Sequence, residues 1–135
     1  LYKDEKHVVK NRQFYDKNFQ LSEQILKSTK PQGGFFNFIP VENDLYATKH
    51  LWENHGVKVM PGSFMAFENN NDNPGKNYLR IALVNDADTT KKGLHRVSNG
   101  LKELVCTILI QRIIQLFCLE VLESFSDLVS MKHLD

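Results

Sequence analysis

The run Tyr78-Leu79-Arg80-Ile81-Ala82-Leu83-Val84 is the most strand-like segment of this 135-residue chain. It is apolar apart from one arginine, and it follows a loop at residues 69–75 that is rich in Asn, Asp, Pro and Gly. Such loops are typical boundaries of strands. A helical pattern begins soon after the run. The chain is therefore expected to contain both helices and strands.

Alternating helical and strand-like patterns divide the chain as far as residue 104. Apolar residues at helical spacing predict helices, and short aromatic or β-branched runs bounded by Pro and Gly predict strands. The expected order is a helix over 4–28, a strand over 35–41, a helix over 45–55, short strands over 57–60 and 64–67, a strand over 78–84 and a helix from about 88 to 104. This mixture predicts a two-layer α+β domain with helices on one face of a small sheet.

Local signals predict where the helices begin and end. Asp44 is expected to cap the helix over 45–55, and Asp88 or Thr89 the helix that follows residue 84. Gly56 is expected in the left-handed position after a helix. The core candidates of the 45–55 helix are Leu51 and Trp52.

Residues 105–135 differ in composition from the rest of the chain. Apolar side chains crowd together at Ile108, Leu109, Ile113, Leu116, Phe117, Leu119 and Leu122. Polar or charged residues interrupt them at Gln111, Arg112, Gln115, Glu120 and Glu123. A membrane span wants about 20 mostly apolar residues with few charges. We therefore favour a helix buried against another subunit or domain over a membrane span.

The charge balance and the cysteines exclude some functions and compartments. Seventeen Lys and Arg against sixteen Asp and Glu give a net charge of +1. This nearly balanced charge does not indicate binding to nucleic acid or to anionic lipid. Cys106 and Cys118 would lie about 18 Å apart on one helix and cannot pair there. Without a disulfide framework or a signal-like start, we expect a cytoplasmic protein. The helical pattern directly after Leu1 suggests a fragment.

Arg80 is the candidate for binding a ligand. Faces alternate along a strand, so Arg80 shares its face with Tyr78, Ala82 and Val84. One interpretation is structural: the arginine reaches water or pairs with an acidic residue. The other is a carboxylate clamp, because the planar guanidinium matches a carboxylate with two parallel hydrogen bonds. The sequence pattern leaves both open.

Other reactive residue types carry no recognisable pattern. The five histidines show no ligand spacing with one another or with cysteine, so no metal site is expected. Ser63 lacks the surroundings of a nucleophile elbow. The lysines are scattered over polar helix faces, and none lies in an apolar setting that would lower its pKa for Schiff-base chemistry.

Four motifs, taken in order, resemble the C-terminal domain of class I/II aminotransferases over residues 5–104. They are Gly33-Gly34-Phe35-Phe36, His55-Gly56-Val57, Pro61-Gly62-Ser63 and Tyr78-Leu79-Arg80-Ile81-Ala82-Leu83. Within that group the chain is most similar to the N-succinyldiaminopimelate aminotransferases of bacterial lysine synthesis. That similarity rests on Asn73-Pro74-Gly75 before the strand and on His7, Asn11-Arg12 and Tyr15 in the first helix.

The resemblance implies the small domain of a fold type I enzyme, with a small, mostly antiparallel sheet, over residues 1–104. The apolar helical extension over 105–135 departs from the family, whose chains normally end near the position of Leu104. The resemblance also implies a homodimeric enzyme that uses pyridoxal 5'-phosphate to move an amino group from glutamate to a keto acid or semialdehyde in lysine and diaminopimelate synthesis. Arg80 matches the arginine that holds the substrate α-carboxylate. The family's Schiff-base lysine and other cofactor ligands belong to the large domain, so this chain is expected to contain no catalytic or cofactor-binding residue and to be inactive alone.

A different class of function remains open. The chain is then a stand-alone, non-catalytic α+β interaction module that associates through its apolar C-terminal helix. A gene that encodes a lysine-bearing large domain upstream of Leu1 would favour the aminotransferase, and a start codon just before Leu1 would favour the module.

Overall fold

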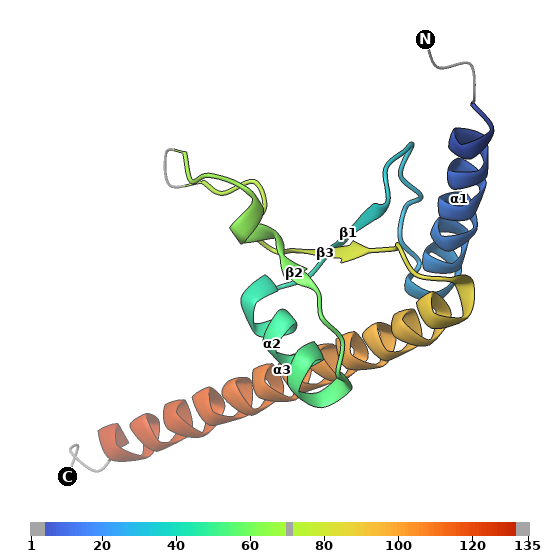
Figure 1. The fold of residues 1–135 in the computed structure, drawn as a ribbon. Helices are drawn as coiled ribbons and strands as arrows, with labels where there is room; N and C mark the ends of the chain where they lie inside the picture. The colour runs from blue at the N-terminus through green and yellow to red at the C-terminus, as the bar shows by residue number, and fades with distance from the viewer. Residues whose placement is uncertain (1–4, 70–71, 132–135) are drawn as a thin grey trace. The chain divides into compact units, whose positions relative to one another are not determined.

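A computed structural model describes residues 5–69 and 72–131, with side chains as far as Phe117. The chain divides into two compact units, residues 1–101 and 102–135. The elements are α1 (Lys6–Leu26), β1 (Phe36–Pro40), α2 (Asp44–His55), β2 (Met60–Pro61), the 3-10 helix η1 (Gly62–Met65), β3 (Tyr78–Ala82) and α3 (Ala87–Met131) (Figure 1).

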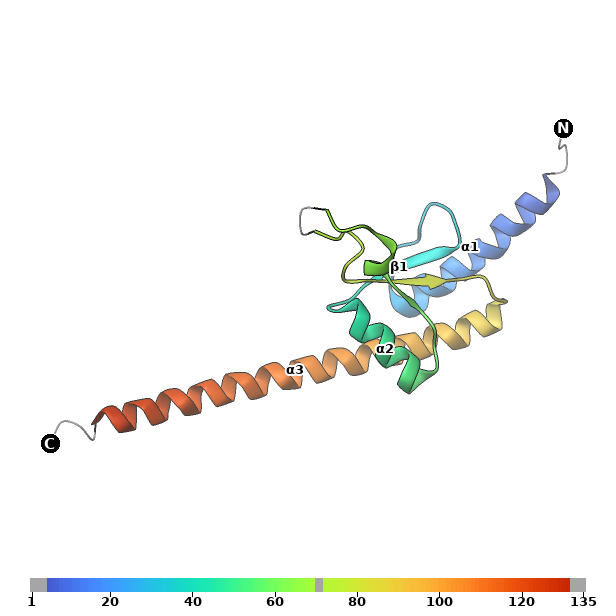
Figure 2. The same cartoon turned by 60° about the vertical axis from the view of Figure 1, so that its left-hand side comes forward.

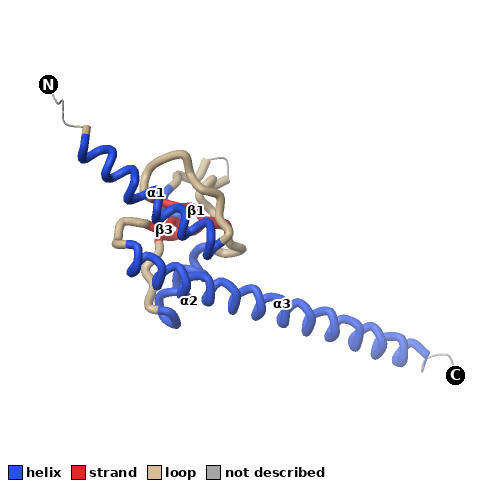
Figure 3. The backbone as a smooth tube through the Cα atoms, turned by 90° about the vertical axis from the view of Figure 1, so that its right-hand side faces the viewer, coloured by secondary structure: helices blue, strands red, loops and turns tan. Residues whose placement is uncertain are grey.

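The three strands form one antiparallel sheet in the order β1-β3-β2. In its register Arg80 of β3 lies opposite Phe38 of β1 on one side and Met60 of β2 on the other. Figure 3 shows β1 and β3 next to each other with α1 across them. This arrangement confirms the predicted α+β fold with a small antiparallel sheet.

The core of the first unit lies on one face of the sheet. Side chains that alternate along the strands are buried there: Asn37 and Ile39 on β1, and Leu79 and Ile81 on β3. The helices contribute Phe19 of α1, Ala47 and Leu51 of α2, and Leu94 and Val97 of α3. Helices therefore cover one face, as predicted (Figure 2). The opposite face, which carries Arg80, is left open.

The helix caps differ from those expected at both positions. The side chain of Asn43, not Asp44, accepts a hydrogen bond of 2.9 Å from the backbone nitrogen of Tyr46 at the start of α2. The cap-like bond at the start of α3 runs from the backbone nitrogen of Thr89 to the carboxylate of Asp86, at 2.9 Å. Asp88 and Thr89 thus lie inside the helix. In both cases the acceptor stands one to three residues earlier, outside the helix, where a side chain reaches the free N–H groups.

The end of α2 is where the sequence predicts it. Gly56 has a φ of 62° and caps the helix in the left-handed conformation. Leu51 is fully buried, as expected, but Trp52 is 51% exposed, so its placement in the core was wrong. Consecutive residues on a helix point in different directions, and α2 turns Leu51 and Ala47 toward the core.

The segment between α2 and β3 is the part that the sequence pattern predicted least well. The strand expected over 57–60 is only Met60–Pro61, and the strand expected over 64–67 is wrong, because Gly62–Met65 form η1. A long-range contact explains the difference. The backbones of Gly62 and Gly75 touch so closely that a Cβ on either residue would collide with the other's carbonyl oxygen.

The second unit is helical where it is described. It continues α3 as far as Met131, in agreement with the predicted helical tail. Its exposed apolar side chains are Val105, Leu109, Ile110, Ile113, Ile114, Leu116 and Phe117, and Cys106 is also exposed. The side chains of Cys118, Leu119, Glu120, Leu122 and Glu123 lie outside the described part. No helix segment among the described residues is long and apolar enough to cross a membrane.

Candidate functional site

Arg80 occupies the middle of the central strand, on the open face of the sheet. β3 buries the residues on either side of it, Leu79 and Ile81, against the helices, and this fixes the arginine on the opposite side. Its cross-strand neighbours on that face, Phe38 and Met60, are about half-exposed. The prediction that Arg80 shares an apolar face is confirmed.

The guanidinium group of Arg80 has two contacts. Its central carbon lies over the ring of Phe36, 4.0 Å from the ring centroid. Its Nη1 donates to the sulfur of Met65 at 3.5 Å. Within the ranges 5–69 and 72–117, whose side chains are described, no carboxylate lies within ion-pair distance of this group.

The missing carboxylate partner has a chemical consequence. A guanidinium carries several N–H donors in a rigid fork, and a thioether sulfur is only a weak acceptor. Most of the donor capacity of Arg80 therefore remains for a ligand or for water. The structural alternative in which Arg80 pairs with an acidic residue finds no support in the described residues. The geometry can bind a carboxylate or another planar anion.

Two turns that were singled out in the sequence lie together and support η1, which carries Met65. The side-chain nitrogen of Asn73 donates to the backbone oxygen of Ser63 at 2.9 Å, and its side-chain oxygen accepts from the backbone nitrogen of Gly75 at 2.9 Å. The close backbone contact of Gly62 with Gly75 adds to these bonds. Pro61-Gly62-Ser63 and Asn73-Pro74-Gly75 thus form one packed unit beside β3.

Asp44 joins this unit to α2. Its carboxylate accepts a hydrogen bond of 2.8 Å from the backbone nitrogen of Ser63. Burial by itself raises the pKa of Asp44, but hydrogen bonds from Ser63 and Asn77 outweigh this effect and leave the pKa below its ordinary value. The ionised carboxylate of Asp44 thus connects α2 to the Pro61-Gly62-Ser63 turn by a hydrogen bond.

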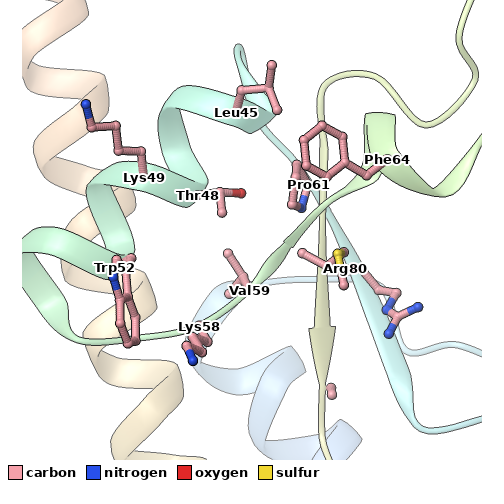
Figure 4. A pocket seen from close by; sticks show the side chains of 11 residues that line it. Leu45, Thr48, Lys49, Trp52, Lys58, Val59, Pro61, Phe64 and Arg80 are labelled. Carbon is pink, nitrogen blue, oxygen red and sulfur yellow. The ribbon is translucent and has the colours of Figure 1, made fainter.

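A pocket of about 640 Å³ lies beside Arg80, between α2 and residues 58–61. Its wall includes Leu45, Thr48, Lys49, Trp52, Lys58, Val59, Met60, Pro61, Phe64, Arg80 and Ala82. Figure 4 shows that the guanidinium of Arg80 points away from Trp52 and Lys58. Lys58 instead lies over the Trp52 ring, with its Nζ 4.8 Å from the centroid. The N–H groups of Arg80 therefore face the open side of the sheet and not the end of the pocket formed by Trp52 and Lys58.

Sequence reasoning found Arg80 but missed the two residues that contact it. The sequence pattern places Phe36 only at the start of a strand, and Met65 in a strand that does not form. The register could have revealed Phe36: it stands two residues before the cross-strand partner of Arg80, at the diagonal distance that long side chains span. No local signal identifies Met65, because its place depends on η1.

The lysines bear on whether this chain holds a cofactor by itself. A lysine that forms a Schiff base needs an apolar environment or a neighbouring cation to lower its pKa. Every lysine whose side chain the structure describes is exposed. The described residues therefore do not fit a Schiff-base cofactor site of their own.

Comparisons with known sequences and structures differ in outcome. No protein-family model matches the chain, and no curated protein matches it either. Solved structures do match. An aminotransferase from Neisseria meningitidis Z2491 is 32% identical, with a TM-score of 0.70 over 73% of this chain and 27% of that protein.

Two further structures share the fold at lower identity. An aromatic aminotransferase from Pyrococcus horikoshii OT3 is 24% identical, with a TM-score of 0.64 over 75% of this chain and 29% of that one. A kynurenine aminotransferase from Pyrococcus horikoshii, solved in complex with PMP, is 22% identical, with a TM-score of 0.59 over 73% of this chain and 26% of that one. All three are aminotransferases. This chain spans only about a quarter of the length of each of these three structures.

Proposed function

We propose that this chain is the C-terminal small domain of a pyridoxal-phosphate-dependent aminotransferase and that Arg80 holds the α-carboxylate of the substrate. The observation that carries this proposal is the donor fork of Arg80 on the open sheet face, which has no carboxylate partner among the described residues, in a fold that matches part of an aminotransferase. In this proposal another part of the longer protein holds the cofactor. The described lysines are all exposed, and none has the apolar environment that a Schiff-base lysine needs.

The role of Arg80 in this proposal is positioning. Two parallel hydrogen bonds from a guanidinium fix both the place and the plane of a carboxylate. They thereby fix the neighbouring α-carbon, so that the bond to be broken is aligned with the reacting groups supplied by the rest of the enzyme. Pyridoxal phosphate, when bound there, supplies the electron sink for the reaction.

We further propose that the longer protein is a cytoplasmic homodimer similar to the N-succinyldiaminopimelate aminotransferases, with glutamate as amino donor and a keto acid or semialdehyde of lysine and diaminopimelate synthesis as acceptor. Support for this narrower assignment comes from Asn73-Pro74-Gly75 and from His7, Asn11-Arg12 and Tyr15. Steady-state transamination by the longer protein, with succinylated and unsubstituted acceptors compared at equal concentration, tests it.

Kinetics of an Arg80→Lys variant of the longer protein test the role of Arg80. Lysine keeps the charge but loses the fork. We expect kcat/KM for glutamate to fall by about ten- to a hundredfold, as for the loss of a charged hydrogen bond of roughly 1.5–3 kcal/mol. A melting curve is recorded on the same preparation. A lower melting temperature with unchanged kcat/KM would return Arg80 to a structural role.

The interaction module is the second candidate, because the tail exposes seven large apolar side chains between residues 105 and 117. The 135-residue chain needs the rest of a longer protein for its activity on the aminotransferase proposal, whereas an interaction module acts alone. On the aminotransferase proposal, glutamate produces no change in the visible absorption of pyridoxal phosphate mixed with this chain alone, whereas the longer protein responds. A glutamate-dependent spectral change with the chain alone would refute the assignment of the cofactor site to another domain.

A further inference from the structure

Phe36 and Arg80 are a diagonal pair across two neighbouring strands. In the register of β1 and β3, Phe36 lies opposite Ala82, and Arg80 lies opposite Phe38. The Arg80 side chain therefore leans along the strand to reach the ring two positions away, where its guanidinium lies 4.0 Å from the centroid. The guanidinium thus lies against the ring, while its Nη1 donates to the weak acceptor sulfur of Met65 at 3.5 Å and most of its N–H groups remain for a ligand or for water.

A row of aromatic rings connects Phe36 to α1. The Phe36 and Phe35 rings lie 4.2 Å apart, and Phe35 and Tyr15 follow at 5.7 Å. Phe14 extends the row, 5.4 Å from Tyr15 in an edge-to-face arrangement. Each of these separations falls in or close to the range in which aromatic rings attract one another. The ring under Arg80 is thus linked to a helix and not only to its own strand.

The strand that carries Phe36 is anchored at the next residue. Asn37 is buried, and its side-chain nitrogen donates to the hydroxyl oxygens of Ser22 at 2.9 Å and Ser28 at 2.7 Å. Gly34 supports the approach to the strand, because its φ of 86° is a conformation that residues with side chains rarely adopt. The backbone on both sides of Phe36 is therefore constrained.

We propose that Phe36 is a positioning residue for Arg80: its ring supports the guanidinium plane so that the N–H edge is held ready for a substrate carboxylate. This inference rests on the proposed function of Arg80. The physical reason is entropic as well as electrostatic. An arginine side chain has several rotatable bonds, and an unsupported one loses that freedom only when the ligand binds. The ring contact removes part of this cost before binding.

The first experiment uses this 135-residue chain and does not depend on catalysis. The Nε–Hε proton of Arg80 is observed by NMR, and the ring of Phe36 should shift it upfield from the position of an unstructured arginine. Phe36→Leu should abolish the shift, and Phe36→Tyr should keep it. Phe38→Leu is the matched control, because Phe38 shares the face and stands directly opposite Arg80.

The backbone amides of Leu79 and Ile81 report whether each variant keeps the sheet. If Phe36→Leu disturbs them, Phe36→Met takes its place, because methionine also lacks the ring and its flexible side chain adapts to the space left. An Arg80 proton that is insensitive to loss of the Phe36 ring, in a variant with an intact sheet, overturns the inference.

The second experiment uses the longer enzyme. Phe36→Leu should raise KM for glutamate by roughly two- to thirtyfold, the range of a cation–π contact, while kcat changes less. Phe36→Tyr should restore KM. In the Arg80→Lys background, Phe36→Leu should add little, because the ring acts through the guanidinium.

The outcomes separate this inference from the proposed function. If Arg80→Lys leaves kcat/KM unchanged, the proposed function of Arg80 fails. If Arg80→Lys lowers kcat/KM but Phe36→Leu does not, only the positioning role of Phe36 fails. An equal loss from Phe36→Leu with and without Arg80 also overturns that role, since the ring would then act on the substrate directly.

Discussion

The side-chain nitrogen of Asn18 donates a hydrogen bond of 2.9 Å to the backbone oxygen of Leu83, far along the chain. The same nitrogen donates to the backbone oxygen of Asn85 at 2.8 Å. Both carbonyl groups lie just beyond the end of β3, where strand pairing no longer satisfies them. Asn18 is almost completely buried, and its bond to Leu83 lies away from competing water, whereas its bond to Asn85 is partly buried. Asn18 of α1 therefore supplies hydrogen-bond donors to the backbone directly after β3, the strand that carries Arg80.

Replacement of Asn18 should destabilise the fold, mainly through the carbonyl group of Leu83. We expect Asn18→Ala to lower the free energy of unfolding by about 1–3 kcal/mol, the cost of leaving the buried Leu83 oxygen without this donor. The Asn85 oxygen, in contrast, keeps a hydrogen bond of 3.1 Å from the Thr90 hydroxyl. Gln20→Ala is the control, because Gln20 is exposed and its side-chain nitrogen donates to Asp16 on the same helix. That change should cost no more than about 0.5 kcal/mol. Urea unfolding of both variants measures the difference, and equal costs would contradict the role of Asn18.

The contact between Gly62 and Gly75 predicts opposite effects for two glycine-to-alanine changes. A Cβ at Gly62 would collide with the backbone of Gly75 and of Tyr78, so Gly62→Ala should destabilise by about 1–3 kcal/mol or more. Gly93 lies inside α3 with no atom close to its missing Cβ, so Gly93→Ala should stabilise by about 0.5–1 kcal/mol. Thermal melting of the two variants checks both signs. A neutral Gly62→Ala would show that the two turns can separate without cost.

The sequence predicts the elements whose signals are local. α1 and α2 follow from apolar spacing, Gly56 from its conformational freedom, and the face of Arg80 from alternation along β3. These signals need no knowledge of the remaining chain. The helical nature of the tail could be predicted for the same reason.

The parts that the sequence does not predict depend on contacts between distant residues. η1 replaces an expected strand because Gly62 packs on Gly75, and apolar composition alone cannot encode that contact. Trp52 is exposed because α2 turns Leu51 inward, which the pattern of one helix leaves open. The candidate site shows the same limit: alternation places Arg80, but the ring beneath it requires the register of two strands.

Asp44 makes stability depend on pH in a stated direction. Its pKa in the folded chain is lower than its ordinary value, through hydrogen bonds from Ser63 and Asn77 that outweigh the effect of burial. The stabilisation is therefore present above the ordinary aspartate pKa of about 4 and is lost as the pH falls through the lower folded-state value. Asp44→Asn should reduce the loss of unfolding free energy between about pH 6 and about pH 3. Urea unfolding at both pH values measures this loss. Glu23→Gln, which removes an exposed carboxylate on α1, controls for the change in net charge.

The tail should drive self-association. Ile113 and Phe117 are 65% and 67% exposed, and five other large apolar side chains between residues 105 and 116 are more than half exposed. Soluble monomers rarely expose a continuous apolar patch beyond roughly 300–600 Å². A helix in water also gains most of its stability from packing of an apolar face and not from its own hydrogen bonds. A second copy of the same helix would supply that packing.

Sedimentation of the full chain and of a chain that ends at Leu104 tests this prediction over a range of concentrations. The full chain should sediment with a concentration-dependent mass above that of a monomer, and the shorter chain as a monomer. The matched control keeps the whole helix but changes Ile113 and Phe117 to glutamate, which exposes charge in place of apolar surface and should also give a monomer. Because that variant retains the length of α3, its effect would separate apolar contact from loss of the segment. Monomeric behaviour of all three chains at every concentration would contradict association through the tail and would leave the interaction-module function without its main support.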